Sequence, residues 1–230
     1  MAVHARGGDR DGYEPVQSRL VSPDQAGDAA ALARAYRDRA KVAEIYVADL
    51  DAITGATAVP QDLSSILSAG LPVMVDAGAA TVPAAQRVLD LGATRVIVGL
   101  ETLTSFSDLG AIVRATGAAD VVFSLDLRDG RPVTRAGATF GRDAPLVVAQ
   151  RATAAGVRSI LVLDLGRVGR SYGPDLPLLQ CIHDALPDIE LLAGGGVRDA
   201  ADLVGLSRAG VAGVLAATAL HEGRDLGKGA

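Results

Sequence analysis

Several residue types that carry specific chemistry are scarce in this chain of 230 residues. It has no tryptophan, one cysteine and two lysines, Lys41 and Lys228. A single cysteine excludes a disulfide framework and is typical of a reducing compartment, so we expect a cytoplasmic protein. Schiff-base chemistry needs a lysine in the active site. Lys228 lies in a Gly-rich tail and Lys41 directly before a predicted strand, which argues against aldolase-type and pyridoxal-phosphate mechanisms.

Long apolar runs and one-sided charge are also missing. No segment approaches the ~18 apolar residues needed to cross a bilayer, and the N-terminus lacks the apolar core of a signal peptide. The net charge is −5, and acidic and basic residues are mixed without a basic block. We therefore expect neither a membrane nor a nucleic acid as a partner.

Seven short runs rich in Val, Ile and Leu alternate with longer segments of helical spacing. Each run is too short for a helix and ends in Gly, Asp or Thr, as buried parallel strands do. The runs cover 43–50, 71–78, 94–100, 120–127, 158–165, 189–196 and 211–218, and the helical segments lie near 24–40, 60–69, 82–91, 105–116, 143–155, 175–186 and 199–208. This alternation predicts a parallel α/β fold, and residues 1–5 could add part of an eighth strand.

An internal repeat distinguishes a barrel from an open doubly wound sheet. VADLDAITG (47–55) matches VLDLGRVGR (162–170), VDAGAAT (75–81) matches AGGGVRD (193–199) with Gly78 over Gly195, and VIVGLETL (96–103) matches VLAATALH (214–221). Three matches in the same order predict two similar half-barrels, about 1–118 and 119–222, with 223–230 as a flexible tail. The Gly-rich turn of a Rossmann-type sheet does not follow the first strand. We therefore predict a (βα)8 TIM barrel that forms a single domain over 1–230.

The first strand of this barrel is expected to be truncated. The second half begins SLDLRDGRPVTRAG (124–137), and its last six residues resemble AVHARG (2–7). The counterpart of SLDLRDG would then lie before residue 1. An Asp equivalent to Asp126 would then be missing from the first half as well.

The loop GGGVRD (194–199) predicts a phosphate site. It follows a strand and opens a helix, so its backbone amides and the helix N-terminus can hold an anion, as the loops after the last two strands of such barrels often do. The predicted phosphate ligands are Gly194, Gly195, Gly196, Arg198, Ala217 and Thr218. The alternative is a tight turn with Asp199 as the helix N-cap.

Carboxylates end several of the predicted strands. Asp126 ends the strand of LDLRDG, where burial would suit it to act as a general acid or base, and the alternative is a buried Asp that holds a loop. Asp49 and Asp164 occupy repeat-related positions, so catalysis and a shared structural duty are both open. Asp164, at the end of the sixth strand, and Gly169 and Arg170, in the loop after it, are candidate substrate ligands. The spacing of these residues predicts no metal site and no cofactor.

VADLDAITG, SLDLRDG, LAGGGVRDAADL and GVLAATALHEG resemble the barrel enzymes of histidine biosynthesis, namely the phosphoribosylformimino-aminoimidazole-carboxamide ribotide isomerase and the cyclase of imidazole glycerol phosphate synthase. The likeness covers essentially the whole chain and is strongest to a divergent isomerase-related branch of methanogens and methylotrophs. It implies two phosphate sites and two catalytic Asp residues, of which Asp126 matches one. Leu163 stands in place of a Thr, and the first-half phosphate loop is reduced to DAGAA (76–80).

The resemblance implies an isomerase that acts on a phosphorylated sugar or ribotide by acid–base catalysis, in an Amadori-type aldose–ketose rearrangement. One alternative is an enzyme of C1-cofactor metabolism with tetrahydromethanopterin or methanofuran. Another is a non-catalytic barrel that binds a phosphometabolite. The expected partner is a phosphorylated small molecule, and the sequence leaves open a monomer or a homo-oligomer.

Overall fold

The computed structural model describes residues 1–3, 14–53, 63–135, 138, 140, 142–168 and 172–227. Its strands are β1 (Ile45–Ala48), β2 (Val73–Asp76), β3 (Arg95–Gly99), β4 (Val121–Arg128), β5 (Arg131–Pro132), β6 (Ser159–Asp164), β7 (Glu190–Gly194) and β8 (Gly213–Leu215). Its helices are η1 (Pro23–Gln25), α1 (Ala29–Ala35), η2 (Tyr36–Ala40), α2 (Leu50–Ile53), α3 (Leu63–Leu67), α4 (Val82–Asp90), α5 (Phe106–Thr116), α6 (Pro145–Ala154), α7 (Leu176–Ala185), α8 (Ala200–Arg208) and α9 (Thr218–His221).

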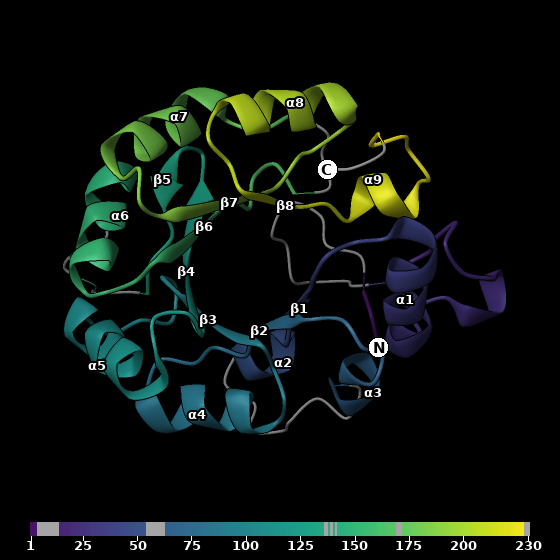
Figure 1. The fold of residues 1–230 in the computed structure, drawn as a ribbon, viewed down its shortest axis with the longest axis horizontal. Coiled ribbons are helices and arrows are strands. Elements are labelled where there is room, and N and C mark those ends of the chain that lie inside the picture. The colour runs from purple at the N-terminus through teal and green to yellow at the C-terminus, as the bar shows by residue number, and fades with distance from the viewer. Residues whose placement is uncertain are drawn as a thin grey trace.

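The strands form the wall of a barrel, and the helices surround it (Figure 1). Among the described residues, seven strands are parallel in the order β1-β2-β3-β4-β6-β7-β8, and β5 pairs antiparallel with the end of β4. No ladder joins β8 to β1 within that part of the chain. The predicted (βα)8-barrel class is thereby confirmed, as a nearly closed ring.

Each predicted strand and helix has its counterpart, and the differences concern short elements. The sequence did not indicate β5, α2 or α9, which span two to four residues each. Val3 forms only an isolated antiparallel bridge with Pro15, and residues 4 and 5 lie outside the described residues. The N-terminal segment therefore adds no parallel strand up to Val3.

The register of the sheet repeats between the two parts of the chain. Met74 pairs with Arg95 across β2 and β3, and Leu192 pairs with Gly213 across β7 and β8, so each residue is related to its counterpart by 118 positions. Thr81 and Asp199, which cap α4 and α8, keep the same offset. The expected match of Gly78 with Gly195 is wrong by one position. Gly78 corresponds to Gly196, and the half-barrel boundaries stay a prediction.

Alternation along the strands divides the core into two layers, because successive side chains point to opposite faces. One set packs inside the barrel as a separate cluster of Met74, Ile97, Val122, Leu161 and Leu192. The other set, including Val73, Val96, Phe123, Ile160 and Leu191, packs against the surrounding helices. Both faces of the strands are thus buried, which explains their continuous apolar runs. No helix among the described residues is long and apolar enough to span a membrane.

An ion-pair network lies where β3 and β7 begin, at the end of the barrel opposite the strand C-termini. Arg95 Nη1 donates to Glu190 Oε2 (2.7 Å), and Arg95 also forms a bidentate pair with Glu44. Ser159 Oγ donates to the same Glu190 oxygen. Burial opposes the charge of Arg95, but the hydrogen bonds and charges of the two glutamates outweigh it and raise its pKa.

Replacing Arg95 by Met should destabilise the fold, because two glutamates would be left facing each other without their cation. We expect a loss of about 3 kcal/mol in the free energy of unfolding, measured by urea denaturation. Arg87→Met, on the exposed side of α4, removes the same charge and should cost less than about 0.5 kcal/mol. Equal losses in the two variants would contradict the structural role of the network.

A partly buried tyrosine joins the first and last parts of the described chain. Tyr36 and His221 lie within hydrogen-bond distance, 3.1 Å from Oη to Nε2, and their rings are 5.9 Å apart. Burial raises the pKa of Tyr36 to about 12. The phenol therefore stays protonated in the folded protein at pH values where an exposed tyrosine, with a pKa of about 10, is ionised.

This pKa predicts a loss of stability in alkali. Between about pH 10 and 12 the unfolded chain releases the Tyr36 proton while the folded chain keeps it, so the free energy of unfolding falls as the pH rises. Tyr36→Phe should remove about 2 kcal/mol of the decrease that denaturation measures between pH 9.5 and 11.5. Tyr172→Phe is the control, because Tyr172 is 65% exposed. An unchanged slope in Tyr36→Phe would refute the assignment.

Candidate active site

Asp126 lies near the C-terminal end of β4, at the mouth of the barrel. Its residue is only 5% exposed, and its Oδ1 accepts a hydrogen bond from Ser124 Oγ at 2.7 Å. Ser124 and Asp126 are two positions apart in one strand, so both side chains point to the same face. The hydroxyl thus holds the carboxylate in one orientation. Ser124 was not among the predicted site residues, although the alternation in SLDL could have identified it.

A second carboxylate, Asp76 at the end of β2, faces the same space. It is 8% exposed. A Cβ atom built on Gly99, at the end of the intervening strand β3, would lie 3.6 Å from Asp126 Oδ2 and 3.8 Å from Asp76 Oδ2. The absence of a side chain at Gly99 therefore lets the two carboxylates converge. The sequence prediction did not include Asp76.

The loop after β7 lies in one row with Asp126. Asp126 pairs with Leu163 of β6, and Leu163 pairs with Gly194 of β7. Two strand spacings place Gly194 and Asp126 roughly 10 Å apart along the sheet. The predicted phosphate loop thus directly follows a residue that shares a hydrogen-bonded row of the sheet with the predicted acid–base residue.

Close packing explains the glycines of this loop. Gly195 and Gly196 have positive φ angles of 99° and 80°. A Cβ on Gly195 would lie 2.6 Å from the carbonyl oxygen of Asp164, and one on Gly194 would lie 2.8 Å from Leu163 Cδ1. The alternative of a tight turn is correct in one respect, since Asp199 Oδ1 accepts hydrogen bonds from the amides of Ala201 and Asp202. Glycine content alone therefore does not establish an anion site.

The backbone amides of the loop remain available for a ligand. Within the described residues, the amides of Gly195, Gly196 and Val197 donate no hydrogen bond. The amide of Arg198, by contrast, donates to Asp202 Oδ2 at 2.8 Å. Any anion bound here would therefore be held by the amides that precede Arg198.

Arg198 is engaged with the helix that it precedes. Its guanidinium donates to both oxygens of Asp202, at 2.9 and 2.7 Å, and these hydrogen bonds lower the pKa of Asp202. About half of the Arg198 side chain is exposed, so one face of it can still meet a ligand. Ala217 is exposed and Thr218, half-buried, begins α9 directly after it.

Asp164 holds the loop after β6 in place through hydrogen bonds. Its Oδ1 accepts from the amide of Gly166 at 3.0 Å, and its Oδ2 accepts from Arg167 Nε at 2.8 Å. Arg167 also donates to the carbonyl of Gly173, so the pair braces both ends of the loop. The predicted ligands Gly169 and Arg170 lie in this loop but outside the described residues.

Asp49 directly follows β1 and caps the short helix α2. Its Oδ1 accepts from the amide of Ala52 at 3.2 Å. Its Oδ2 is buried and has no hydrogen-bond partner within the described part of the chain. The repeat-related Asp49 and Asp164 thus share a structural duty, since each accepts a hydrogen bond from a backbone amide two or three residues further along the chain. That Asp49 also takes part in catalysis stays a prediction.

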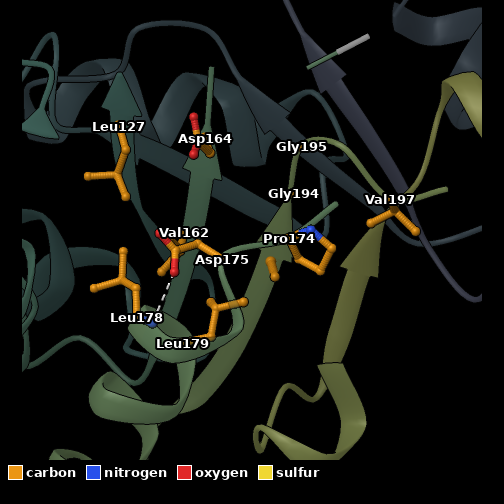
Figure 2. A pocket seen from close by; sticks show the side chains of 11 residues that line it. Leu127, Val162, Asp164, Pro174, Asp175, Leu178, Leu179, Gly194, Gly195 and Val197 are labelled. Carbon is orange, nitrogen blue, oxygen red and sulfur yellow. Dashed lines mark hydrogen bonds between the residues drawn. The ribbon is translucent and has the colours of Figure 1, made fainter. Parts of the chain in front are cut away.

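A small pocket lies beside the loop, on the outer side of the barrel wall (Figure 2). It is bounded by β6, β7 and the start of α7, where Asp175 caps the helix through the amide of Leu178. Its volume of about 20 Å³ holds roughly one water molecule. This pocket is too small for a substrate, so the candidate site is the mouth above Gly99 and Gly194. Within the described residues, no group of three or more His, Cys, Asp or Glu side chains is arranged to hold a metal ion.

Comparison with known proteins gives consistent matches. The model of the family described as histidine biosynthesis protein matches residues 3–225. Three curated relatives are each named 1-(5-phosphoribosyl)-5-((5-phosphoribosylamino)methylideneamino) imidazole-4-carboxamide isomerase. The one from Xylella fastidiosa (strain M12) is 33% identical, over 78% of this chain and 70% of its own length.

The relative from Alkaliphilus metalliredigens is 32% identical, and the one from Stenotrophomonas maltophilia is 33% identical. Each alignment covers 84% of this chain and 83% of the relative. The chain belongs to the histidine biosynthesis protein family.

Proposed function

We propose that this chain is an isomerase that interconverts the aldose and ketose forms of a phosphorylated sugar or ribotide. The relatives are named as isomerases of a compound with two phosphoribosyl groups, which supports both the reaction class and a phosphorylated substrate. Its cytoplasmic location and its oligomeric state stay predictions.

One observation carries the proposal: Asp126, Leu163 and Gly194 form a row across β4, β6 and β7. A phosphate held by the amides of 195–197 would therefore present the rest of a sugar to Asp126. The start of α8 adds favourable partial charge for the anion. We propose that Thr218 and the exposed face of Arg198 complete this phosphate site.

In this proposal Asp126 transfers the proton that an aldose–ketose rearrangement moves between neighbouring carbons. Ser124 Oγ donates to Oδ1, and Oδ2 lies on the side of Gly99. A positioned carboxylate of this kind contributes on the order of 10² to 10⁴ to the rate. Leu163 and Leu215, which pack on the interior cluster, would form the apolar floor beneath the substrate.

Asp126→Asn should lower kcat at least about a hundredfold and leave KM within about threefold, because Asn keeps the size and the hydrogen bond to Ser124. The assay follows conversion of the substrate named for the relatives. Asp188→Asn, in the exposed loop before β7, is the matched control and should match the parent protein. Full activity of Asp126→Asn would refute the catalytic role.

The same assay tests Asp49. Asn at position 49 can still cap α2, so a purely structural Asp49 predicts a loss of less than about threefold. A decrease comparable to that of Asp126→Asn would confirm the prediction that Asp49 takes part in catalysis.

Thr218→Val should raise KM about tenfold with little change in kcat, since it removes one hydrogen bond to a charged phosphate, worth about 1.5 kcal/mol. Thr116→Val, at the C-terminal end of α5, is the control and should leave both constants unchanged. An unaltered KM in Thr218→Val would exclude Thr218 from the phosphate site.

A further inference from the structure

We infer that Arg167 is a positioning residue of the phosphate site: acting through Gly173, it orients the loop after β7 and thereby sets the affinity for the phosphate. The inference rests on the proposed function, because it takes the loop after β7 as the phosphate site. It adds the loop after β6 as the support that holds this site in shape.

Arg167 is anchored to the end of a buried strand. Its Nε donates to Asp164 Oδ2 at 2.8 Å, and Asp164 Oδ1 accepts from the amide of Gly166 at 3.0 Å. Figure 2 shows Asp164 at the end of β6, beside Gly194 and Gly195 at the end of β7. The guanidinium is therefore held at a fixed place next to the proposed phosphate loop.

A chain of hydrogen bonds leads from Arg167 into that loop. Arg167 Nη1 donates to the carbonyl oxygen of Gly173 at 2.8 Å, and the amide of Gly173 donates to the carbonyl oxygen of Gly196 at 3.1 Å. The two loops also touch directly, since a Cβ atom built on Gly196 would lie 3.1 Å from Arg167 Cβ. Gly173 is thus held by Arg167 on one side and by the phosphate loop on the other.

The hydrogen bond to Gly196 fixes the direction of a free amide. In a trans peptide the carbonyl and the N–H that follows it point in opposite directions. Because the carbonyl of Gly196 points to Gly173, the amide of Val197 points away from Gly173. This amide donates to no other residue within the described part of the chain. One donor for the anion is therefore oriented before a ligand arrives, which reduces the cost of binding.

Gly173 also contacts a second proposed ligand of the phosphate. A Cβ atom on Gly173, whose φ angle is 78°, would lie 3.0 Å from Nη2 and 3.1 Å from Cζ of Arg198. The absence of a side chain thus lets the guanidinium of Arg198 lie against the backbone. A displacement of Gly173 would disturb Arg198 and the amide of Val197 together.

Replacing Arg167 by Met tests the inference, because Met keeps the contact of Cβ with Gly196 but removes both hydrogen bonds. The KM of the substrate named for the relatives should rise about tenfold. The kcat should stay within about twofold, since Asp126 lies on β4 and outside this chain of hydrogen bonds. Arg87→Met, on the exposed side of α4, is the matched control and should change neither constant. An unchanged KM in Arg167→Met, or a decrease in kcat alone, would overturn the inference.

Arg167→Lys separates positioning from simple attraction between charges. Lysine keeps the positive charge, but its ammonium lacks the planar fork that joins Asp164 to Gly173. The KM should therefore still rise at least about threefold. A KM equal to that of the parent protein would mean that only the charge matters, and it would refute the positioning role.

A double-mutant cycle tests whether Arg167 acts through Gly173. Gly173→Ala adds a Cβ atom against Arg198 and should raise the KM as well. If both residues act on one chain of contacts, the KM of the double variant should stay within about twofold of the larger single effect. Multiplication of the two single effects would contradict the inference.

A titration with inorganic phosphate, followed through the backbone amide resonances, needs no catalytic activity. The amide of Val197 should shift and saturate in the parent protein, and Arg167→Met and Arg167→Lys should need several times more phosphate for the same shift. Equal saturation in the parent and both variants would overturn only the role of Arg167. No shift in the parent protein would instead overturn the phosphate site itself, and with it the proposed function.

Discussion

The parallel register of the barrel is the constraint on which the rest of the structure depends. Since successive residues of a strand point to opposite faces, the register decides which side chains meet inside the ring. It places Met74, Ile97, Val122, Leu161 and Leu192 in one apolar cluster. Above this cluster, the same alternation turns Ser124 and Asp126 toward the mouth. A shift of one residue in β4 would move Asp126 to the helix-facing side, so the packing of the core and the position of the candidate catalytic group are fixed together.

Strands buried on both faces could be predicted because their apolar runs are short, continuous and regularly spaced. The end of each run then located the mouth, which is why Asp126 and the glycines of the loop after β7 could be named from the sequence. The short elements could not be predicted. The helix α2 begins where Asp49 accepts a hydrogen bond from the amide of Ala52. A helix of one turn is too short to leave a periodic pattern in the sequence. The repeat likewise misplaced Gly78 by one position, since an alignment of glycines carries less information than the register and the two helix caps.

The proximity of Asp76 and Asp126 to Gly99 could not be predicted from the sequence, for a different reason. The two residues belong to strands that are not adjacent, and the Oδ2 atoms of both lie beside Gly99 of the strand between them. Similarly, Arg198 was predicted as a phosphate ligand, and the prediction did not include the hydrogen bonds between its guanidinium and Asp202. Contacts across the ring, such as that of Asp76 and Asp126 with Gly99, depend on the curvature of the sheet, which the spacing of residues in the sequence does not give.

Carboxylates at the two ends of the barrel have different hydrogen-bond partners. Where the strands begin, Glu44 and Glu190 are paired with Arg95, and the network stabilises the fold. At the mouth, the hydroxyl of Ser124 donates to Asp126 Oδ1 and the amide of Gly78 donates to Asp76 Oδ1, and these bonds orient the two carboxylates. Buried carboxylates in such surroundings cost stability, and functional sites are where such costs concentrate. The two half-barrels share one register but differ at Asp76 and Gly194. A Cβ atom at Gly194 would lie 2.8 Å from Leu163 Cδ1, so the packing of the second half requires a glycine where the first half carries a carboxylate.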